Sequence, residues 1–312
     1  DFGRSASLSS VLVCVCMAMW LMQNYITSRN SYRLVSGKGS RPARTKLSVP
    51  GQIGAWIWVA LVVLIAIGVP YFSIISTSLI KLRGYGLAAG NFTLDHYREL
   101  LTTPKALSSI RKSLFLAVSS ATICSVIGTA VVVAVRKSGG FLRKTLEGVS
   151  LLPEMLPSIV LVIGIMLFWN AIYKVIPLYN TIGIMVLAYV VLYLPYTVQY
   201  VTSAFTQINE SLLEAGRAFG GTPAYVFRRV TLPMISRGIF AGWMMIFIIA
   251  FRELVTASLI APPNTLVVST YINREFEQGS VSLGMAMAVL CVIITTTALL
   301  IFNRFVGKKK GD

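Results

Sequence analysis

The chain has 312 residues, of which 55% are hydrophobic and only 12% are charged, and its mean hydropathy is +0.74. Soluble globular proteins carry about 25% charged residues, so this composition excludes a water-soluble globule, a disordered chain and a disulfide scaffold. The net charge of +17 would indicate nucleic-acid binding in a soluble protein, but membrane proteins gather Lys and Arg in cytoplasmic loops. We therefore expect a multi-pass membrane protein that contacts membrane lipid and no nucleic acid.

Seven apolar runs are long enough to cross a bilayer core of about 30 Å, which takes about 20 helical residues. They are Leu8–Ile26, Trp56–Ile80, Ser113–Val135, Val149–Tyr173, Ile182–Ala204, Ile239–Ile260 and Leu283–Phe305. Because lipid offers the backbone no hydrogen-bond partner, each run should be helical, which makes the fold class all-α. Pro157 in the fourth run and Pro195 in the fifth predict kinks in their helices.

The Lys and Arg residues divide unevenly between the polar segments that connect these runs. One alternate set of segments, which includes residues 27–55, 205–237 and 307–312, carries twice as many of them as the other set. Because positive charge favours the cytoplasmic side, this set should be cytoplasmic. The N-terminus of this chain is then outside and its C-terminus is in the cytoplasm.

The runs also divide the chain into parts. Residues 1–26 hold one transmembrane helix, and residues 27–55 form a basic cytoplasmic linker rich in Gly, Ser and Pro. Residues 56–306 hold the other six spans, and residues 307–312 form a basic cytoplasmic tail. We expect a compact set of six helices preceded by one extra transmembrane helix.

Two features that could indicate a ligand site do not. The linker fragment Ser36–Pro42 lacks the pattern of a phosphate-binding loop, because Tyr32 and Gly39 occupy the positions of its first Gly and its Ser or Thr. The four cysteines lie inside apolar runs with no CxxC pair and no neighbouring histidine, so neither a disulfide nor a metal site is predicted. No cluster of His, Asp or Ser within the spans indicates an intramembrane enzyme.

The cytoplasmic segment 205–237 has the strongest pattern outside the membrane. A helix is expected from Glu210 to Phe219, and Gly220-Gly221 should end it. Thr222 suits an N-cap and Pro223 suits the first position of a second helix, which should end at Leu232-Pro233. Two short helices with small residues at the bend have a shape that docks into a groove on another protein.

The same segment carries a resemblance to a known family. Glu214-Ala215-Gly216 is followed after three residues by Gly220 and after nine more by Val230-Thr231-Leu232-Pro233. This spacing resembles the EAA loop, EAA-x3-G-x9-I-x-LP, of permease subunits of binding-protein-dependent (type I) ABC importers. Gly216 replaces the second Ala and Val230 replaces Ile, and both replacements keep small or β-branched character.

The resemblance implies that this loop couples the chain to an ATP-binding subunit, two of which serve each transporter. The implied coupling residues are Glu214, Ala215, Gly216, Phe219, Gly220, Leu232 and Pro233. ATP and magnesium would then belong to the partner ATPase. This chain would be a transport subunit and not an enzyme, with no catalytic residue, no metal site and no cofactor of its own.

The six spans from Trp56 to Phe305 are similar to the six-helix core of these permeases. Phe92–Tyr97 resembles a short family motif, and Leu152–Gly164 resembles its Pro-rich third helix. The leading helix and linker resemble the junction inside fused permeases of the ferric-iron type, so this chain would be the C-terminal half of one. That implies a second permease half, a periplasmic or surface substrate-binding protein, and a place in the bacterial cytoplasmic (inner) membrane.

Ferric iron is the substrate that this resemblance favours, with a phosphonate, a polyamine or another small solute as alternatives. Arg252 and Glu253 are adjacent charges inside an apolar run, and ionisable groups at that depth are candidates for a substrate path. Equally, Arg252 could extend to the outer surface while Glu253 pairs with a neighbouring helix. The outer loops should meet the binding protein, with Arg274, Glu275 and Glu277 at the rim steering its docking.

An ion-driven secondary transporter is a competing class. Such a protein should show internal repeats, broken helices and charged residues near the midplane. Only Arg252 and Glu253 fit that description, and this interpretation leaves the segment Glu214–Pro233 without a role.

Overall fold

The computed structural model describes residues 48–308 and, ahead of them, residues 11, 14–15, 17–19 and 22. The predicted span Leu8–Ile26, apart from those positions, lies outside the described residues, as do the linker up to residue 47 and the tail beyond residue 308. Every named element of the described part is a helix and none is a strand, which confirms the all-α fold.

Sixteen elements follow one another along the described part of the chain. They are α2 (Val49–Val63), η1 (Leu64–Gly68), α3 (Val69–Leu79), η2 (Arg83–Tyr85), α4 (Asp95–Thr102), α5 (Pro104–Lys137), α6 (Gly140–Met155), α7 (Ser158–Ala171), α8 (Ile182–Thr206), α9 (Glu210–Ala218), α10 (Pro223–Val226), η3 (Phe227–Thr231), α11 (Leu232–Phe251), α12 (Val255–Ile260), α13 (Val268–Gln278) and α14 (Val281–Lys308).

Five helical segments among the described residues are long and apolar enough to cross a membrane, and the bent pair α6–α7 makes a sixth if it counts as one span. The five are Val49–Leu79, Pro104–Lys137, Ile182–Thr206, Pro223–Phe251 and Val281–Arg304. Each overlaps an apolar run in the sequence. A multi-pass membrane protein is therefore confirmed.

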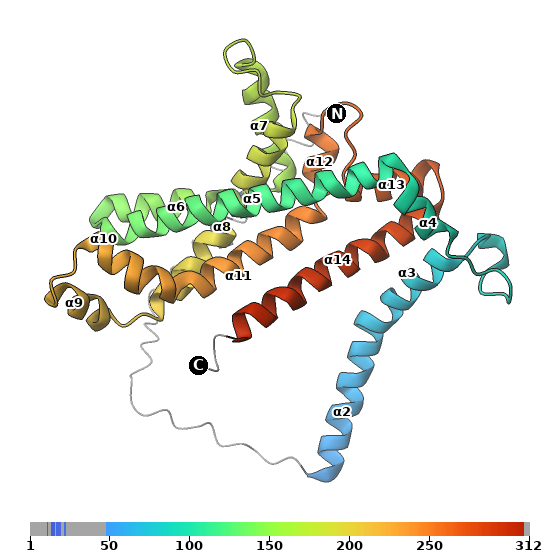
Figure 1. Ribbon diagram of the computed structural model, residues 1–312, viewed down its shortest axis with the longest axis horizontal. Coiled ribbons are helices and arrows are strands. Elements are labelled where there is room, and N and C mark those ends of the chain that lie inside the picture. Colours follow the sequence, from blue (N-terminus) through green and yellow to red (C-terminus); the bar gives the residue numbers. More distant parts are fainter. Residues whose placement is uncertain (1–10, 12–13, 16, 20–21, 23–47, 309–312) are drawn as a thin grey trace.

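Helices α5, α8 and α11 pack together along most of their lengths and form the centre of the molecule (Figure 1). Small residues let them approach closely. A Cβ atom added to Gly128 of α5 would lie 2.6 Å from Thr197 Cγ2 in α8, and one added to Gly238 of α11 would lie 2.5 Å from Ala204 Cβ. Close packing through small residues is how helices associate in lipid, where burial of apolar surface gives no advantage.

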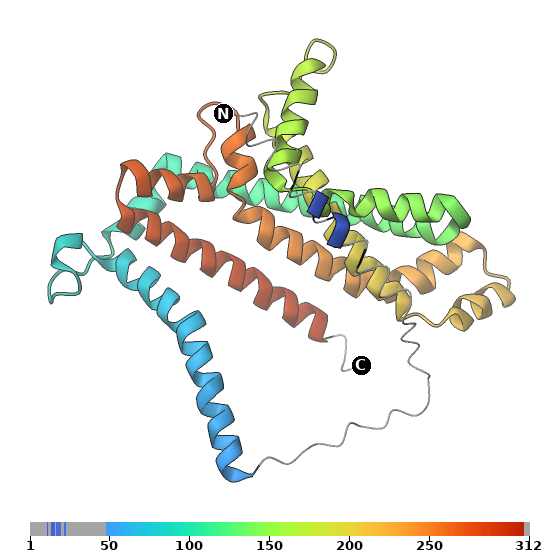
Figure 2. The same cartoon turned by 180° about the vertical axis from the view of Figure 1, so that it is seen from behind.

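The first described helix lies apart from this centre. Helix α2 diverges from the bundle, whereas α3 lies against α14 (Figures 1 and 2). None of the most apolar stretch of Val49–Leu79 is buried within the chain. Lipid or another protein subunit must therefore cover this face in the membrane.

The predicted fourth span, Val149–Tyr173, is broken at Leu156-Pro157. Helices α6 and α7 meet there at an angle of 106°, and α7 projects from the bundle (Figure 1). Leu156 is extended, with ψ at 139°, because the ring of Pro157 excludes the helical conformation from the residue before it. The kink predicted at Pro157 is confirmed as a sharp bend, while α8 runs without a break through Pro195.

Two π-turns, η1 and η3, interrupt otherwise α-helical spans, and each comes directly before an X-Pro pair. The N–H of Val69 donates to the carbonyl of Leu64 ahead of Pro70, and the N–H of Leu232 donates to the carbonyl of Phe227 ahead of Pro233. Proline lacks an N–H and its ring crowds the carbonyl four residues earlier. The wider turn moves that carbonyl aside, so the helix continues.

Candidate functional site

The segment α9–α10 forms a small helical hairpin at one end of the bundle (Figure 1). Its first helix begins at Glu210, where the side-chain oxygen of Asn209 accepts the N–H of Ser211 at 3.2 Å. It ends before Gly220, whose φ of +80° is a conformation that favours glycine. The Gly221 N–H then donates to the Gly216 carbonyl at 3.1 Å, which satisfies a terminal carbonyl of the helix.

The start of the second helix also matches its prediction. The Thr222 hydroxyl accepts the N–H of Tyr225 at 3.3 Å, and Pro223 occupies the first helical position. The predicted end of this helix at Leu232-Pro233 is wrong. Through η3 the helix passes into α11, so that Pro223–Phe251 is one continuous rod, because the π-turn accommodates Pro233.

The two short helices pack through a small residue at their contact. A Cβ atom on Gly216 would lie 3.2 Å from Val226 Cγ2, and one on Gly221 would lie 2.5 Å from the Gly216 carbonyl oxygen. Val226 is buried, so it anchors α10 against α9. A small residue at position 216 therefore has a packing reason that is local to this chain.

The outer face of the hairpin is exposed and partly apolar. The Phe219 side chain is 94% exposed, and Leu212 and Tyr225 are also exposed. Glu214 and Ala215 lie on the same helix and are exposed too, and Leu232 and Pro233 follow in the first turn of α11. The predicted coupling residues thus lie in one continuous piece of the structure, α9 to the start of α11.

A cavity of about 340 Å³ lies between this hairpin and the end of α5. Glu214 lines it together with three cations, Arg136, Lys137 and Arg217. The Arg136 guanidinium lies over the Phe205 ring, 4.8 Å from its centroid. Sequence reasoning did not include Arg136 and Lys137 in the site, although two adjacent cations at the end of a membrane span were a usable signal.

Arg252 and Glu253 lie at a break between helices. The prediction of one helix over Ile239–Ile260 is wrong, because α11 ends at Phe251 and α12 begins at Val255. The Glu253 carboxylate causes the new start: its Oε1 accepts the Thr256 N–H at 3.0 Å and the Thr256 hydroxyl at 3.1 Å. A carboxylate placed so satisfies free N–H groups and stabilises the start of a helix.

The two charges take different positions at this break. Arg252 is exposed, whereas Glu253 is half-buried and its Oε2 accepts the Tyr193 hydroxyl of α8 at 2.5 Å. The Ser269 hydroxyl donates to the Glu253 carbonyl, also at 2.5 Å. Sequence reasoning did not find Tyr193, which lies 60 residues away in the chain. Glu253 thus joins α8, α12 and α13.

Comparison with known proteins agrees with this geometry. Residues 126–311 match the family described as "Binding-protein-dependent transport system inner membrane component". The Fe(3+)-transport system permease protein FbpB 2 of Haemophilus influenzae is 22% identical over 98% of this chain, and this chain spans 58% of its length. The spermidine/putrescine permease protein PotC of the same organism is 21% identical over 78% of this chain and 92% of its own length.

Other similarities point to the same fold. The putative 2-aminoethylphosphonate permease protein PhnV of Salmonella typhimurium is 23% identical over 85% of this chain and 98% of its own length. A bacterial ABC transporter that imports alginate superimposes with a TM-score of 0.68 at 16% identity, over 82% of this chain and 95% of that one. The MetNI methionine ABC transporter in an inward-facing conformation superimposes with a TM-score of 0.57 at 19% identity. That alignment covers 70% of this chain and 99% of the MetNI chain.

The identification made from the loop Glu214–Pro233 is thereby confirmed. The family match covers more than half of the described sequence and includes α8 to α14. This chain belongs to the family of inner membrane components of binding-protein-dependent transport systems, the permeases of type I ABC importers.

Proposed function

We propose that this chain forms half of the translocation path of an ATP-driven importer and carries ferric iron into the cytoplasm. Its partners are two ATP-binding subunits, a second permease half and a substrate-binding protein on the outer side. ATP and magnesium are held by the ATP-binding subunits, and this chain supplies no catalytic group. The N-terminus of this chain lies outside and the C-terminus in the cytoplasm, in agreement with the distribution of Lys and Arg.

The observation that carries the coupling role is the rigid connection between the hairpin α9–α10 and the bundle. An exposed aromatic side chain, Phe219, projects from the hairpin, and Pro223–Phe251 is one helical segment of 29 residues. A movement imposed at Phe219 is therefore carried along α11, over about 30 Å, to the break at Arg252. Closure of the two ATP-binding subunits would move this segment as a rigid body and change the access of the path.

Two observations favour iron among the solutes named for the relatives. The Fe(3+) permease aligns with 98% of this chain, whereas PotC and PhnV align with 78% and 85%. At the helix break, the Glu253 carboxylate and the Tyr193 hydroxyl place oxygen donors side by side within the bundle. Oxygen donors suit hard cations, so these groups fit a path for a ferric ion better than one for a phosphonate.

The test is uptake of radiolabelled ferric iron into proteoliposomes that contain the full complex and its binding protein, with and without ATP. We expect an ATP-binding subunit to co-purify and uptake to require ATP. A co-purifying ATPase without iron uptake would reject iron and leave the importer role, and putrescine and 2-aminoethylphosphonate would be tested next. Absence of any co-purifying ATPase would contradict the coupling role of Glu214–Pro233.

A further inference from the structure

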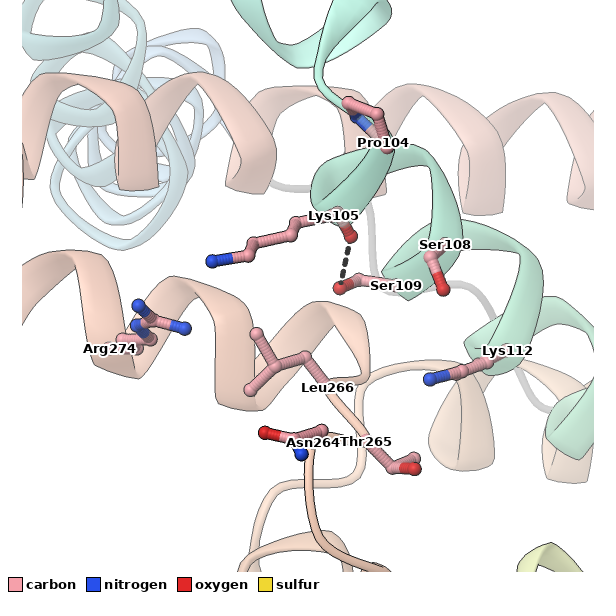
Figure 3. Close-up of a pocket in the computed structure, with 9 residues that line it drawn as sticks. All are labelled: Pro104, Lys105, Ser108, Ser109, Lys112, Asn264, Thr265, Leu266 and Arg274. Carbon is pink, nitrogen blue, oxygen red and sulfur yellow. Dashed lines mark hydrogen bonds between the residues drawn. The ribbon is translucent and has the colours of Figure 1, made fainter.

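A second cavity lies at the opposite end of the bundle from α9–α10. It has a volume of about 450 Å³, within the range of about 300–1,000 Å³ of small-ligand sites. Its walls are the start of α5, the loop 262–266 and helix α13 (Figure 3). None of the coupling or path residues described above lines it.

Three cations line this cavity from different elements. Lys105 and Lys112 come from α5 and Arg274 comes from α13. The Lys105 and Arg274 side chains extend toward one another, and the Lys112 side chain extends from α5 above Thr265 (Figure 3). No Asp or Glu is among the described residues that line the cavity, so its charge is uniformly positive.

The carboxylates nearest in sequence to Arg274 are occupied elsewhere. Glu275 Oε2 accepts the backbone N–H of Ser280 at 3.4 Å, and Glu277 Oε1 accepts the side-chain amide of Asn273 at 2.8 Å. Within the described part of the chain, neither Lys105, Lys112 nor Arg274 forms a salt bridge. Like charges that face one cavity repel each other, so an anion bound between them would lower the electrostatic energy.

Neutral donors complete the cavity. The Ser108 hydroxyl and the Asn264 amide line it, and Ser109, which also lines it, donates its own proton to the Lys105 carbonyl at 2.9 Å. The Val268 N–H donates to the Ser113 hydroxyl at 2.8 Å, which fixes the start of α13 against α5. Cations from two such joined helices, together with hydroxyl and amide donors, are what binding of an oxyanion requires.

The length of α5 places the cavity at the membrane surface. At 34 residues the helix is about 51 Å long, whereas the hydrocarbon core is about 30 Å thick. The apolar run begins at Ser113, so the turns with Lys105 and Lys112 extend beyond the core. They lie at the end that the distribution of charge assigns to the outside.

We propose that this cavity binds a phosphate-type oxyanion, either free in solution or as the headgroup of an anionic lipid. The ammonium groups and the guanidinium hold the anion's charge, and Ser108 and Asn264 donate hydrogen bonds to its oxygens. The site is independent of the solute that the importer carries, so it stands or fails separately from the transport of iron.

Two probes separate the sources, both with the full detergent-purified complex. Isothermal titration with inorganic phosphate measures the free ion, and native mass spectrometry after addition of phosphatidylglycerol or phosphatidylcholine measures the headgroup. Lys112→Gln with Arg274→Gln should weaken phosphate binding by about tenfold or more, or abolish selective retention of phosphatidylglycerol. Arg98→Gln with Arg111→Gln is the matched control, because it also removes two charges, from α4 and α5, and neither residue lines the cavity.

Each outcome of these measurements either supports or overturns the proposed oxyanion site. Loss of phosphate binding in the cavity variants alone identifies a free oxyanion, and loss of phosphatidylglycerol alone identifies a lipid headgroup. An equal loss in Arg98→Gln with Arg111→Gln would overturn the proposal in favour of diffuse surface charge. The proposal is also wrong if neither probe binds the wild-type complex, whether or not Arg274→Gln weakens docking of the binding protein. Lys112→Arg should retain binding, and unchanged thermal unfolding of each variant excludes a folding defect.

Discussion

The two ends of helix α11 are held in place by different kinds of interaction. At its start, the hairpin α9–α10 is shaped by contacts between residues close in sequence, such as Thr222 with Tyr225. At its end, Glu253 binds groups from α8 and α13, 60 and 16 residues away. In the coupling role proposed above, the first end would follow a partner subunit while the second is tied to the bundle. The rod between them would then transmit a displacement into the core.

The largest effect is expected at Glu253, whose side chain joins α8 to the start of α12. Glu253→Ala would leave the Tyr193 hydroxyl and the Thr256 N–H without their acceptor, at a cost of about 3 kcal/mol in the free energy of unfolding. Chemical denaturation in detergent measures this loss. Tyr193→Phe removes only one donor and is expected to cost about 1 kcal/mol. Equal stability of Glu253→Ala and the wild type would show that the carboxylate is not structural.

A smaller loss is expected from tight packing in the hairpin. Gly221→Ala places a Cβ atom 2.5 Å from the Gly216 carbonyl oxygen, and relief of that overlap should cost about 2 kcal/mol locally. Because α9–α10 lies at the end of the bundle, we expect weaker assembly with the ATP-binding subunit and unchanged global unfolding. Gly84→Ala is the control, since its added Cβ meets nothing within 4 Å.

Reversal of charge tests the coupling role itself. Glu214→Lys would add a fourth cation to the cavity that Arg136, Lys137 and Arg217 already line, and we expect ATP-dependent uptake to fall about tenfold. Glu147→Lys is matched in charge and lies on the exposed face of α6, in a pair with Arg143 that contributes little. Normal uptake by Glu214→Lys at normal expression would count against the coupling role.

The smallest change probes the cap of α10. Thr222→Ala removes the acceptor for the Tyr225 N–H and should destabilise the hairpin by about 1 kcal/mol. Hydrogen exchange of the α10 amides would detect this as faster opening. Thr222→Ser retains the hydroxyl and should restore slow exchange, and identical rates in all three proteins would show that the cap adds nothing.

The difference between the two ends of α11 also explains what the sequence could predict. Thr222, Pro223 and Gly220 act within one or two turns, so their roles follow from residue type and spacing, and the structure confirms them. The break after Phe251 depends on Tyr193 and Ser269, whose proximity to Glu253 is created only by the packing of other helices. An apolar run therefore predicted a span correctly and its continuity wrongly.

The cavity lined by Lys105, Lys112 and Arg274 also could not be predicted from local sequence patterns. Arg274 was expected at a rim that meets the binding protein, on the basis of its loop alone. Its approach to Lys105 and Lys112 depends on the docking of α13 against α5 through Ser113, which is 155 residues from Val268. No local pattern in the sequence brings these three cations together.

The π-turns before Pro70 and Pro233 have a consequence for the lengths of related chains. A π-turn adds one residue to an α-helix without adding a turn, which shifts the faces of the residues on either side by about 100°. Deletion of one residue from Phe227–Thr231, together with replacement of Pro233 by a residue that an ordinary helical turn accepts, would therefore still present the same face of α11 to the bundle. Alignments of permeases should accept single-residue gaps at these two turns. The residues that face the bundle should be assigned separately for the helix before each turn and the helix after it.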